Sequence, residues 1–249
     1  MADLTPDALL LAGMILVAAA LYSSVGHGGA SAYLAAMALV GTSHEVMKPT
    51  ALTLNILVAG IATFRFWRAG RFCLRTFLVF TVASAPMALV GGYVSLPGTW
   101  YRKIVGLALL FAAWRLAFAG RGGETAEKRL VPLESALAIG AALGLLSGLT
   151  GVGGGIYLTP ILILMRWSEP REAAGISAAF ILVNSIAGFC GLLARLPALP
   201  TALPLWAIMA CVGGLVGSTL GSRYFAGSTV RRVLAVVLLI AGSKLLWVA

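Results

Sequence analysis

Two glycine-rich stretches carry the residue types best suited to binding a small ligand. The first glycine turn, residues 23–30, reads Ser-Ser-Val-Gly-His-Gly-Gly-Ala, and the second glycine turn, residues 148–155, reads Gly-Leu-Thr-Gly-Val-Gly-Gly-Gly. Each lies between two apolar runs and so interrupts a potential membrane helix. Irregular backbone is tolerated in a bilayer only where protein buries it or where it lines a polar cavity. Two such interruptions in corresponding places predict the binding site of a transporter.

The chemistry expected at these turns is recognition of a small oxyanion. A helix is predicted to begin just after each turn, where unpaired N–H groups and the positive end of the helix dipole favour an anion. Nearby hydroxyl groups add neutral donors. The alternative is that the glycines only permit close helix packing, as small residues do between membrane helices. The candidate substrate-binding residues are Ser23, Ser24, Gly26, His27, Gly28, Gly29, Asn55, Ser147, Thr150, Gly151, Gly153, Gly154, Gly155 and Asn184.

Three of these candidates have side chains that are costly to bury without a partner. His27 is the one ionisable residue in either turn, and its counterpart in the second turn is Val152. We expect His27 either to donate to an anion or carry a coupling proton, or to be neutral and bonded to backbone. Asn55 and Asn184 lie in corresponding apolar spans. Each amide needs a partner, which is either the freed backbone of a glycine turn or the substrate.

Composition places the chain in a membrane. Of its 249 residues, 60% are hydrophobic and only 10% are charged, and the mean hydropathy is +0.99. A soluble domain carries about 25% charged residues. Long apolar runs favour helices over a barrel, whose strands alternate in polarity. The net charge of +10 comes from basic residues in short loops, where they set topology, so it does not predict nucleic-acid binding.

Five apolar runs occur in each half of the chain. Residues 31–40 and 156–165 are shorter than the roughly twenty needed to cross a bilayer. We therefore predict an all-α polytopic membrane protein of two inverted repeats, each of about five helical elements, with 8–10 crossings and broken or re-entrant helices at the glycine turns. The N-terminal half is residues 1–119, a cytoplasmic linker is 120–132, and the C-terminal half is 133–249. The runs are 8–22, 31–40, 49–67, 74–94, 99–118, 133–146, 156–165, 173–194, 205–222 and 230–248.

The internal repeat rests on three matches that occur in the same order. Residues 26–29 match 151–154, residues 87–94 match 209–216, and Arg102-Lys103 matches Arg231-Arg232. An odd number of elements in each half inverts the second copy. Placing both termini outside the cell membrane puts 13 of the 18 Lys and Arg residues inside, as the positive-inside rule expects. Re-entrant hairpins and full crossings give the same count.

Other polar residues offer little catalytic chemistry. We expect His44, Glu45 and Lys48 to form a solvated face, with a guard at an entrance as the alternative. The three cysteines, Cys73, Cys190 and Cys211, are expected to be buried packing residues, with redox or ligand chemistry as the weaker alternative. The acidic residues lie in predicted loops, in the termini or, for Glu134, at the start of an apolar run, and there is no phosphate-binding motif of the type G-x-x-x-x-G-K-[ST]. The sequence predicts no catalytic residue, no metal site and no cofactor.

The second glycine turn, extended to Ser147 and followed by Pro160, resembles the motif of the sulfite exporter TauE/SafE family of membrane permeases. The first turn and the two-half layout add to this similarity, which extends over nearly the whole chain. The resemblance implies about eight spans from a four-plus-four duplication, and transport of small, often sulfur-containing anions across the cytoplasmic membrane. The chain departs from the pattern at His27 and at Ala30, where the second copy has Gly155.

The sequence thus predicts a secondary transporter that moves sulfite, thiosulfate or an organosulfonate by rocking one half against the other around the glycine turns. Its partners would be the small anion, the lipid bilayer, a coupling proton or sodium ion, and further copies of the chain in an oligomer. A passive anion channel is the main alternative. A membrane-embedded enzyme and a non-transporting assembly partner are weaker alternatives.

Overall fold

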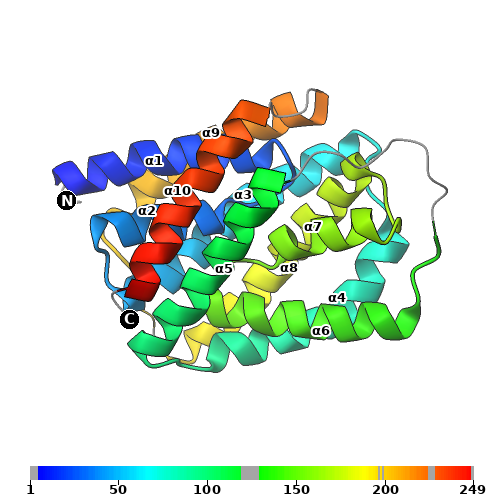
Figure 1. The fold of residues 1–249 in the computed structure, drawn as a ribbon, viewed down its shortest axis with the longest axis horizontal. Helices are drawn as coiled ribbons and strands as arrows, with labels where there is room; N and C mark the ends of the chain where they lie inside the picture. Colours follow the sequence, from blue (N-terminus) through cyan, green and yellow to red (C-terminus); the bar gives the residue numbers. More distant parts are fainter. Residues whose placement is uncertain (1–4, 119–128, 196, 198, 224–227, 248–249) are drawn as a thin grey trace.

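The computed structural model describes residues 5–118, 129–195, 197, 199–223 and 228–247. These residues form ten α-helices and no β-strand, as the sequence predicts (Figure 1). Most of the linker predicted at 120–132 lies outside the described residues. The helices are α1 (Pro6–Ser23), α2 (Ala30–Val40), α3 (His44–Arg68), α4 (Leu74–Tyr93), α5 (Gly98–Phe118), α6 (Leu133–Thr150), α7 (Gly155–Leu164), α8 (Pro170–Leu193), α9 (Leu203–Arg223) and α10 (Ser228–Trp247).

Length and hydropathy together identify the helices that can cross a bilayer. Within the described residues, α1, α3, α4, α6, α8 and α9 are long and apolar enough to cross. Helices α2 and α7 have 11 and 10 residues. At about 1.5 Å per residue they reach only half of the roughly 30 Å hydrocarbon core. The short pieces that follow the glycine turns therefore do not cross alone, which agrees with broken or re-entrant helices.

Glycine backbone conformation breaks the helices at both turns. Gly26, Gly29, Gly151, Gly153 and Gly154 all have φ between 76° and 98°, a region that L-residues with a Cβ rarely enter. Two of them stand in left-handed geometry directly before α2 and α7, and a third caps the end of α6. Each turn can therefore reverse the chain within a few residues and start a new helix inside the bundle.

The two halves of the chain are interleaved rather than separate. Helix α1 of the N-terminal half packs along α9 of the C-terminal half, and α6 of the C-terminal half packs along α4 of the N-terminal half (Figure 1). Helix α3 packs on α9 as α8 packs on α4, while α3 with α8 and α5 with α10 form pairs across the halves. The result is an α1–α3–α9 group and an α4–α6–α8 group that meet along α3 and α8.

Matched glycines occupy matched places in these two groups. A Cβ at Gly91 of α4 would contact main-chain atoms of α6, and a Cβ at Gly213 of α9 would contact main-chain atoms of α1. Their neighbours behave alike, because Gly92 lies against α8 and Gly214 lies against α3. This pairing agrees with an internal repeat. The inverted orientation of its copies across a membrane stays a prediction.

Two local expectations from the sequence are wrong. Helix α3 begins at His44 rather than near residue 49, so Lys48 lies inside a helix and is only 7% exposed instead of solvated. Polar residues at a helix start had suggested a loop. The cysteines are not buried either: Cys190 is exposed, and Cys73 and Cys211 are partly exposed. Cys190 lies on α8 and Cys211 on α9, whereas Cys73 directly precedes α4.

Candidate substrate site between the glycine turns

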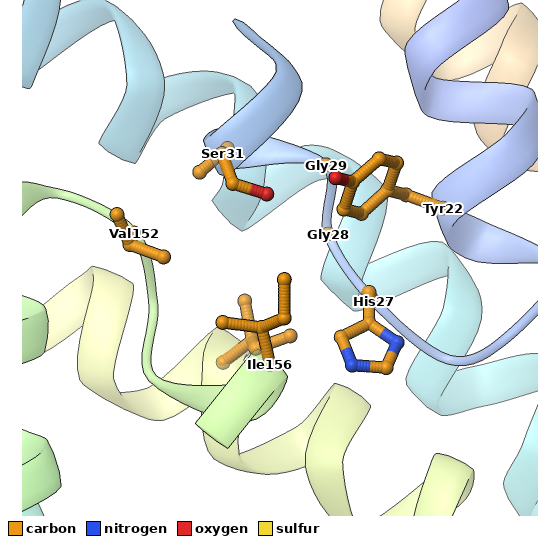
Figure 2. A pocket seen from close by; sticks show the side chains of 9 residues that line it. Tyr22, His27, Gly28, Gly29, Ser31, Val152 and Ile156 are labelled. Carbon is orange, nitrogen blue, oxygen red and sulfur yellow. The ribbon is translucent and has the colours of Figure 1, made fainter. Parts of the chain in front are cut away.

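A small cavity lies where the two glycine turns meet (Figure 2). Its volume is about 10 Å³, which is about the room that one water molecule needs. The N-terminal half supplies its polar side chains and the C-terminal half supplies only apolar ones. The lining residues are Tyr22, His27, Gly28, Gly29, Ala30, Ser31, Val152, Ile156 and Ile181.

Two hydroxyl groups and a helix start form the polar wall. Tyr22, at the end of α1, is buried, and its hydroxyl faces that of Ser31 in the first turn of α2. Among the described residues the Tyr22 hydroxyl has no hydrogen-bond partner of good geometry. A buried hydroxyl without a partner is costly unless a ligand or water binds it. This wall can therefore donate hydrogen bonds to an anion without carrying a full positive charge.

Asn55 joins the two turns. Its side chain is fully buried in α3, and its Oδ1 accepts a hydrogen bond of 3.1 Å from the N–H of Ala30 at the start of α2. Its Nδ2 donates to the carbonyl oxygen of Val152 and to Ser185 Oγ, both at 3.4 Å. Both freed backbone groups thus find a partner inside the bundle. Of the two partners predicted for this amide, the structure supplies the backbone.

Ile181 of α8, in the C-terminal half, occupies a position equivalent to that of Asn55 of α3 in the N-terminal half. Both side chains lie where a Cβ on Gly28 or on Gly153 would be, so each touches both turns. Ile181 also lies against Gly155 at the start of α7, as Asn55 lies against Ala30 at the start of α2. An amide therefore holds the first helix start, and an aliphatic side chain packs against the second.

His27 links the first turn to the C-terminal half. Its Nδ1 lies 3.0 Å from the carbonyl oxygen of Val25, and its Nε2 lies 3.4 Å from Thr159 Oγ1 of α7. Thr159 in turn donates to Ser177 Oγ of α8 at 2.7 Å. The ring also lies edge-on to Tyr22, with centroids 6.3 Å apart. A change in the protonation of His27 would thus be felt by hydroxyl groups on α7 and α8.

Of the predicted site residues, only His27, Gly28 and Gly29 line the cavity. The hydroxyls of Ser23, Ser24 and Thr150 donate instead to main-chain carbonyls of Gly214, Leu21 and Leu146, at 3.2, 2.7 and 2.6 Å. They serve helix packing and helix ends. Gly26, Gly151, Gly153, Gly154 and Gly155 shape the turns around the cavity.

Ser147 and Asn184 are buried away from the lining. Neither Ser147 Oγ nor Asn184 Oδ1 has a hydrogen-bond partner in the described part of the chain. Asn184 Nδ2 donates to the carbonyl oxygen of Phe180, one helical turn earlier. Asn184 is therefore not the spatial counterpart of Asn55, although the two lie in corresponding helices.

Sequence reasoning missed Tyr22 and the apolar wall. Tyr22 ends an apolar run, where an aromatic residue is more typical of a membrane interface. Ile156 and Ile181 resemble any other core residue in sequence. The useful signal was position: Tyr22 immediately precedes the first turn, and Ile156 follows the last glycine of the second. No group of three metal-binding side chains occurs in the described residues.

Long apolar helices around a cavity at two broken-helix turns define a polytopic α-helical membrane protein of the transporter class. A family model described as "Sulfite exporter TauE/SafE" matches residues 10–245. The chain therefore belongs to the sulfite exporter TauE/SafE family and is a membrane transporter.

Two relatives carry transporter names. The "Probable membrane transporter protein y4hK" of Sinorhizobium fredii is 38% identical over 244 residues, covering 97% of this chain and 99% of the relative. The "Probable membrane transporter protein YunE" of Bacillus subtilis is 21% identical over 273 residues, covering 96% and 97%. No solved structure matches the chain.

Proposed function

We propose that this protein is a secondary transporter of a small oxyanion, such as sulfite, thiosulfate or an organosulfonate, and that the cavity between the glycine turns is its substrate site. The observation that carries the proposal is the buried Tyr22 hydroxyl, which faces the Ser31 hydroxyl at a helix start and makes no hydrogen bond of good geometry to any described residue. A helix start with neutral donors suits a small anion. The lining residues include no carboxylate that would repel one.

Transport requires the cavity to widen. At about 10 Å³ it is too small for a four- or five-atom oxyanion, so we take this conformation as a contracted state. The interleaved helices also change which parts would move. The first turn and Asn55 belong with the α1–α3–α9 group, and the second turn and Ile181 with the α4–α6–α8 group. We therefore propose that these groups, rather than the sequence halves, rock against each other.

The proposed setting follows from charge and from the repeat. The protein would lie in the cell membrane with both termini outside and residues 120–132 inside, and residues 1–119 and 133–249 would be inverted copies. His27 would carry a coupling proton, because it lies on the cavity and contacts both halves. Sodium coupling is the alternative.

A flux assay tests the proposal. Purified protein in liposomes would be offered radiolabelled sulfite, thiosulfate, sulfate and a sulfonate, with and without a pH or sodium gradient. Uptake against the anion's own gradient, driven by one ion gradient, is the expected result. Tyr22→Phe should weaken apparent affinity, while Tyr93→Phe, at a side chain 55% exposed, should not.

The same assay separates the alternatives. An anion channel would give electrical conductance and no concentrative uptake. An enzyme would consume a substrate without vesicle flux. Either outcome, or flux that is equal in empty liposomes, would contradict the proposal.

A further inference from the structure

Lys48 is a buried cation at a junction between helices that the substrate cavity does not use. Its Nζ lies 3.1 Å from the carbonyl oxygen of Gly91, 3.2 Å from that of Gly92 and 3.4 Å from that of Val94. These carbonyls belong to the end of α4, where a helix leaves its last oxygens without internal partners. An ammonium group suits this place because the helix C-terminus is the negative end of its dipole.

The contact crosses between the two helix groups. Lys48 lies near the start of α3, in the α1–α3–α9 group, whereas its carbonyl partners lie in the last turn of α4 and at Val94 directly after it, in the α4–α6–α8 group. The carbonyl oxygen of Tyr93, which lies between Gly92 and Val94 in the sequence, has a different partner. It accepts a hydrogen bond of 2.8 Å from Arg195 Nε. Arg195 follows α8 and so stays within its own group. Lys48 is therefore the cation that would lose its partners if the groups separated here.

Lys48 also touches the second glycine turn. A Cβ at Gly151 would lie 3.3 Å from the main-chain oxygen of Lys48 and 3.5 Å from its Cγ. The next residue, Val152, lines the cavity. In Figure 1 the start of α3 and the end of α4 lie toward the end of the bundle that holds the start of α1 and the end of α10. Lys48 thus lies near this end of the bundle and also in contact with the second glycine turn.

The matching position on the opposite side carries an alanine. Gly26 in the first turn lies against main-chain atoms of Ala174 near the start of α8, as Gly151 lies against Lys48 near the start of α3. Ala174 therefore occupies the position equivalent to Lys48, and its methyl group cannot bind carbonyl oxygens.

We propose that Lys48 is a latch between the two helix groups, which holds this end closed over the cavity and must release the α4 carbonyls for this end to open. Once released, its ammonium stands beside the opened route and attracts an anion. This inference rests on the alternating movement in the proposed function. It differs from a simple helix cap because the contact must break in every transport cycle.

Cysteine accessibility tests the latch without any substrate. In a background that lacks Cys73, Cys190 and Cys211, Val152→Cys reports on the cavity through its reaction with a negatively charged methanethiosulfonate reagent, added to each side of the membrane in turn. Lys48→Met should make this reaction about tenfold faster from the side of the chain termini, as expected when charged hydrogen bonds that favour the closed state are lost. From the linker side the rate should not rise.

Two further variants complete the experiment. Lys103→Met removes a charge from an exposed lysine that lies over Trp100, and it should leave the labelling rate unchanged. Lys48→Arg can still donate hydrogen bonds to carbonyl oxygens, so the cysteine of Val152→Cys should react as slowly as in the parent. Equal labelling of Lys48→Met and the parent, or faster labelling from both sides, would overturn the latch.

Failure to fold is also informative. If Lys48→Met gives no folded protein while Lys48→Arg does, Lys48 is needed for folding and the latch is overturned. The proposed function is judged separately, by the flux of the unmodified protein. If the unmodified protein gives flux but Lys48→Met does not change labelling, the latch alone is contradicted. If Lys48→Met changes labelling but the unmodified protein gives no flux, the transport proposal alone is contradicted.

Discussion

The two glycine turns share a backbone conformation but differ in the side chains around them. Each breaks a helix with left-handed glycines, starts a short helix and packs against the same pair of side chains, Asn55 and Ile181. Yet His27 stands where the second turn has Val152, and Asn55 holds one helix start where Ile181 packs on the other.

This difference indicates that the glycines shape the cavity, whereas the polar side chains bind the ligand. Glycine shapes both walls of the cavity, while polar side chains occur on one wall only. A small anion with a polar and an apolar side could be held against one wall and shielded from water by the other. The comparison predicts that substitutions affecting shape cost most, and that substitutions on the polar wall change binding with little loss of stability.

The largest effect is expected for Gly153→Ala. Gly153 has φ of 85°, and an added Cβ would lie 2.7 Å from Asn55 Nδ2 and 2.8 Å from Ile181. Flux should fall at least about a hundredfold, because the turn must move away from both side chains. Gly41→Ala is the matched control, since Gly41 has the same φ and nothing within 4 Å of the added atom. It should cost only the backbone strain of about 1–2 kcal/mol. Equal effects in proteoliposome flux and thermal unfolding would show that packing against the turn is unimportant.

The next effect concerns the bridge between the turns. Asn55→Leu removes the partner of the Ala30 N–H and of the Val152 carbonyl. Each buried group left unpaired costs about 1–3 kcal/mol, so the unfolding temperature should fall by several degrees and flux should fall more than tenfold. Asn184→Leu should be far milder, because among the described residues no group donates a hydrogen bond to Asn184 Oδ1. A milder loss for Asn55→Leu than for Asn184→Leu, measured by thermal unfolding in detergent, would argue against the bridge.

A smaller effect is expected on the polar wall. Tyr22→Phe removes a hydroxyl that has no hydrogen bond of good geometry within the described part of the chain, so stability should not fall, while the apparent KM for the anion should rise about five- to tenfold. Tyr33→Phe is the contrasting variant, because the Tyr33 hydroxyl donates to the carbonyl of Gly28 at 2.8 Å. It should lower the unfolding temperature. If Tyr22→Phe destabilises the protein without changing KM, the hydroxyl serves packing rather than binding.

The smallest effect on maximal rate is expected for His27→Gln. Glutamine keeps hydrogen bonding but cannot take up or release a proton as histidine can, so the dependence of flux on pH should flatten while the best rate changes little. Thr159→Val removes the hydroxyl beside His27 Nε2 and should shift the same pH profile. Profiles that match the unmodified protein in both variants would remove the proton role and leave His27 as a polar lining residue.

The sequence predicted which segments form helices but not which helices pack against one another. Apolar runs mark helices clearly because the lipid phase demands continuous hydrophobic sequence and satisfied backbone. The start of α3 was missed because Glu45 and Lys48 look like a loop, and only the end of α4 supplies carbonyls that make a buried lysine tolerable. Interleaving of the halves was not visible either. Helix packing depends on glycine contacts between distant segments, such as Gly91 against α6.

The sequence alone determined that this is a helical membrane protein with two related glycine turns, because composition, run length and glycine spacing are properties of the chain itself. Tertiary structure decided what those turns do to each other. It placed Asn55 between them, turned Ser23, Ser24 and Thr150 toward backbone, and brought Tyr22 into the cavity. A hydroxyl's partner is set by whichever group lies within about 3 Å in space, and sequence order does not fix that distance.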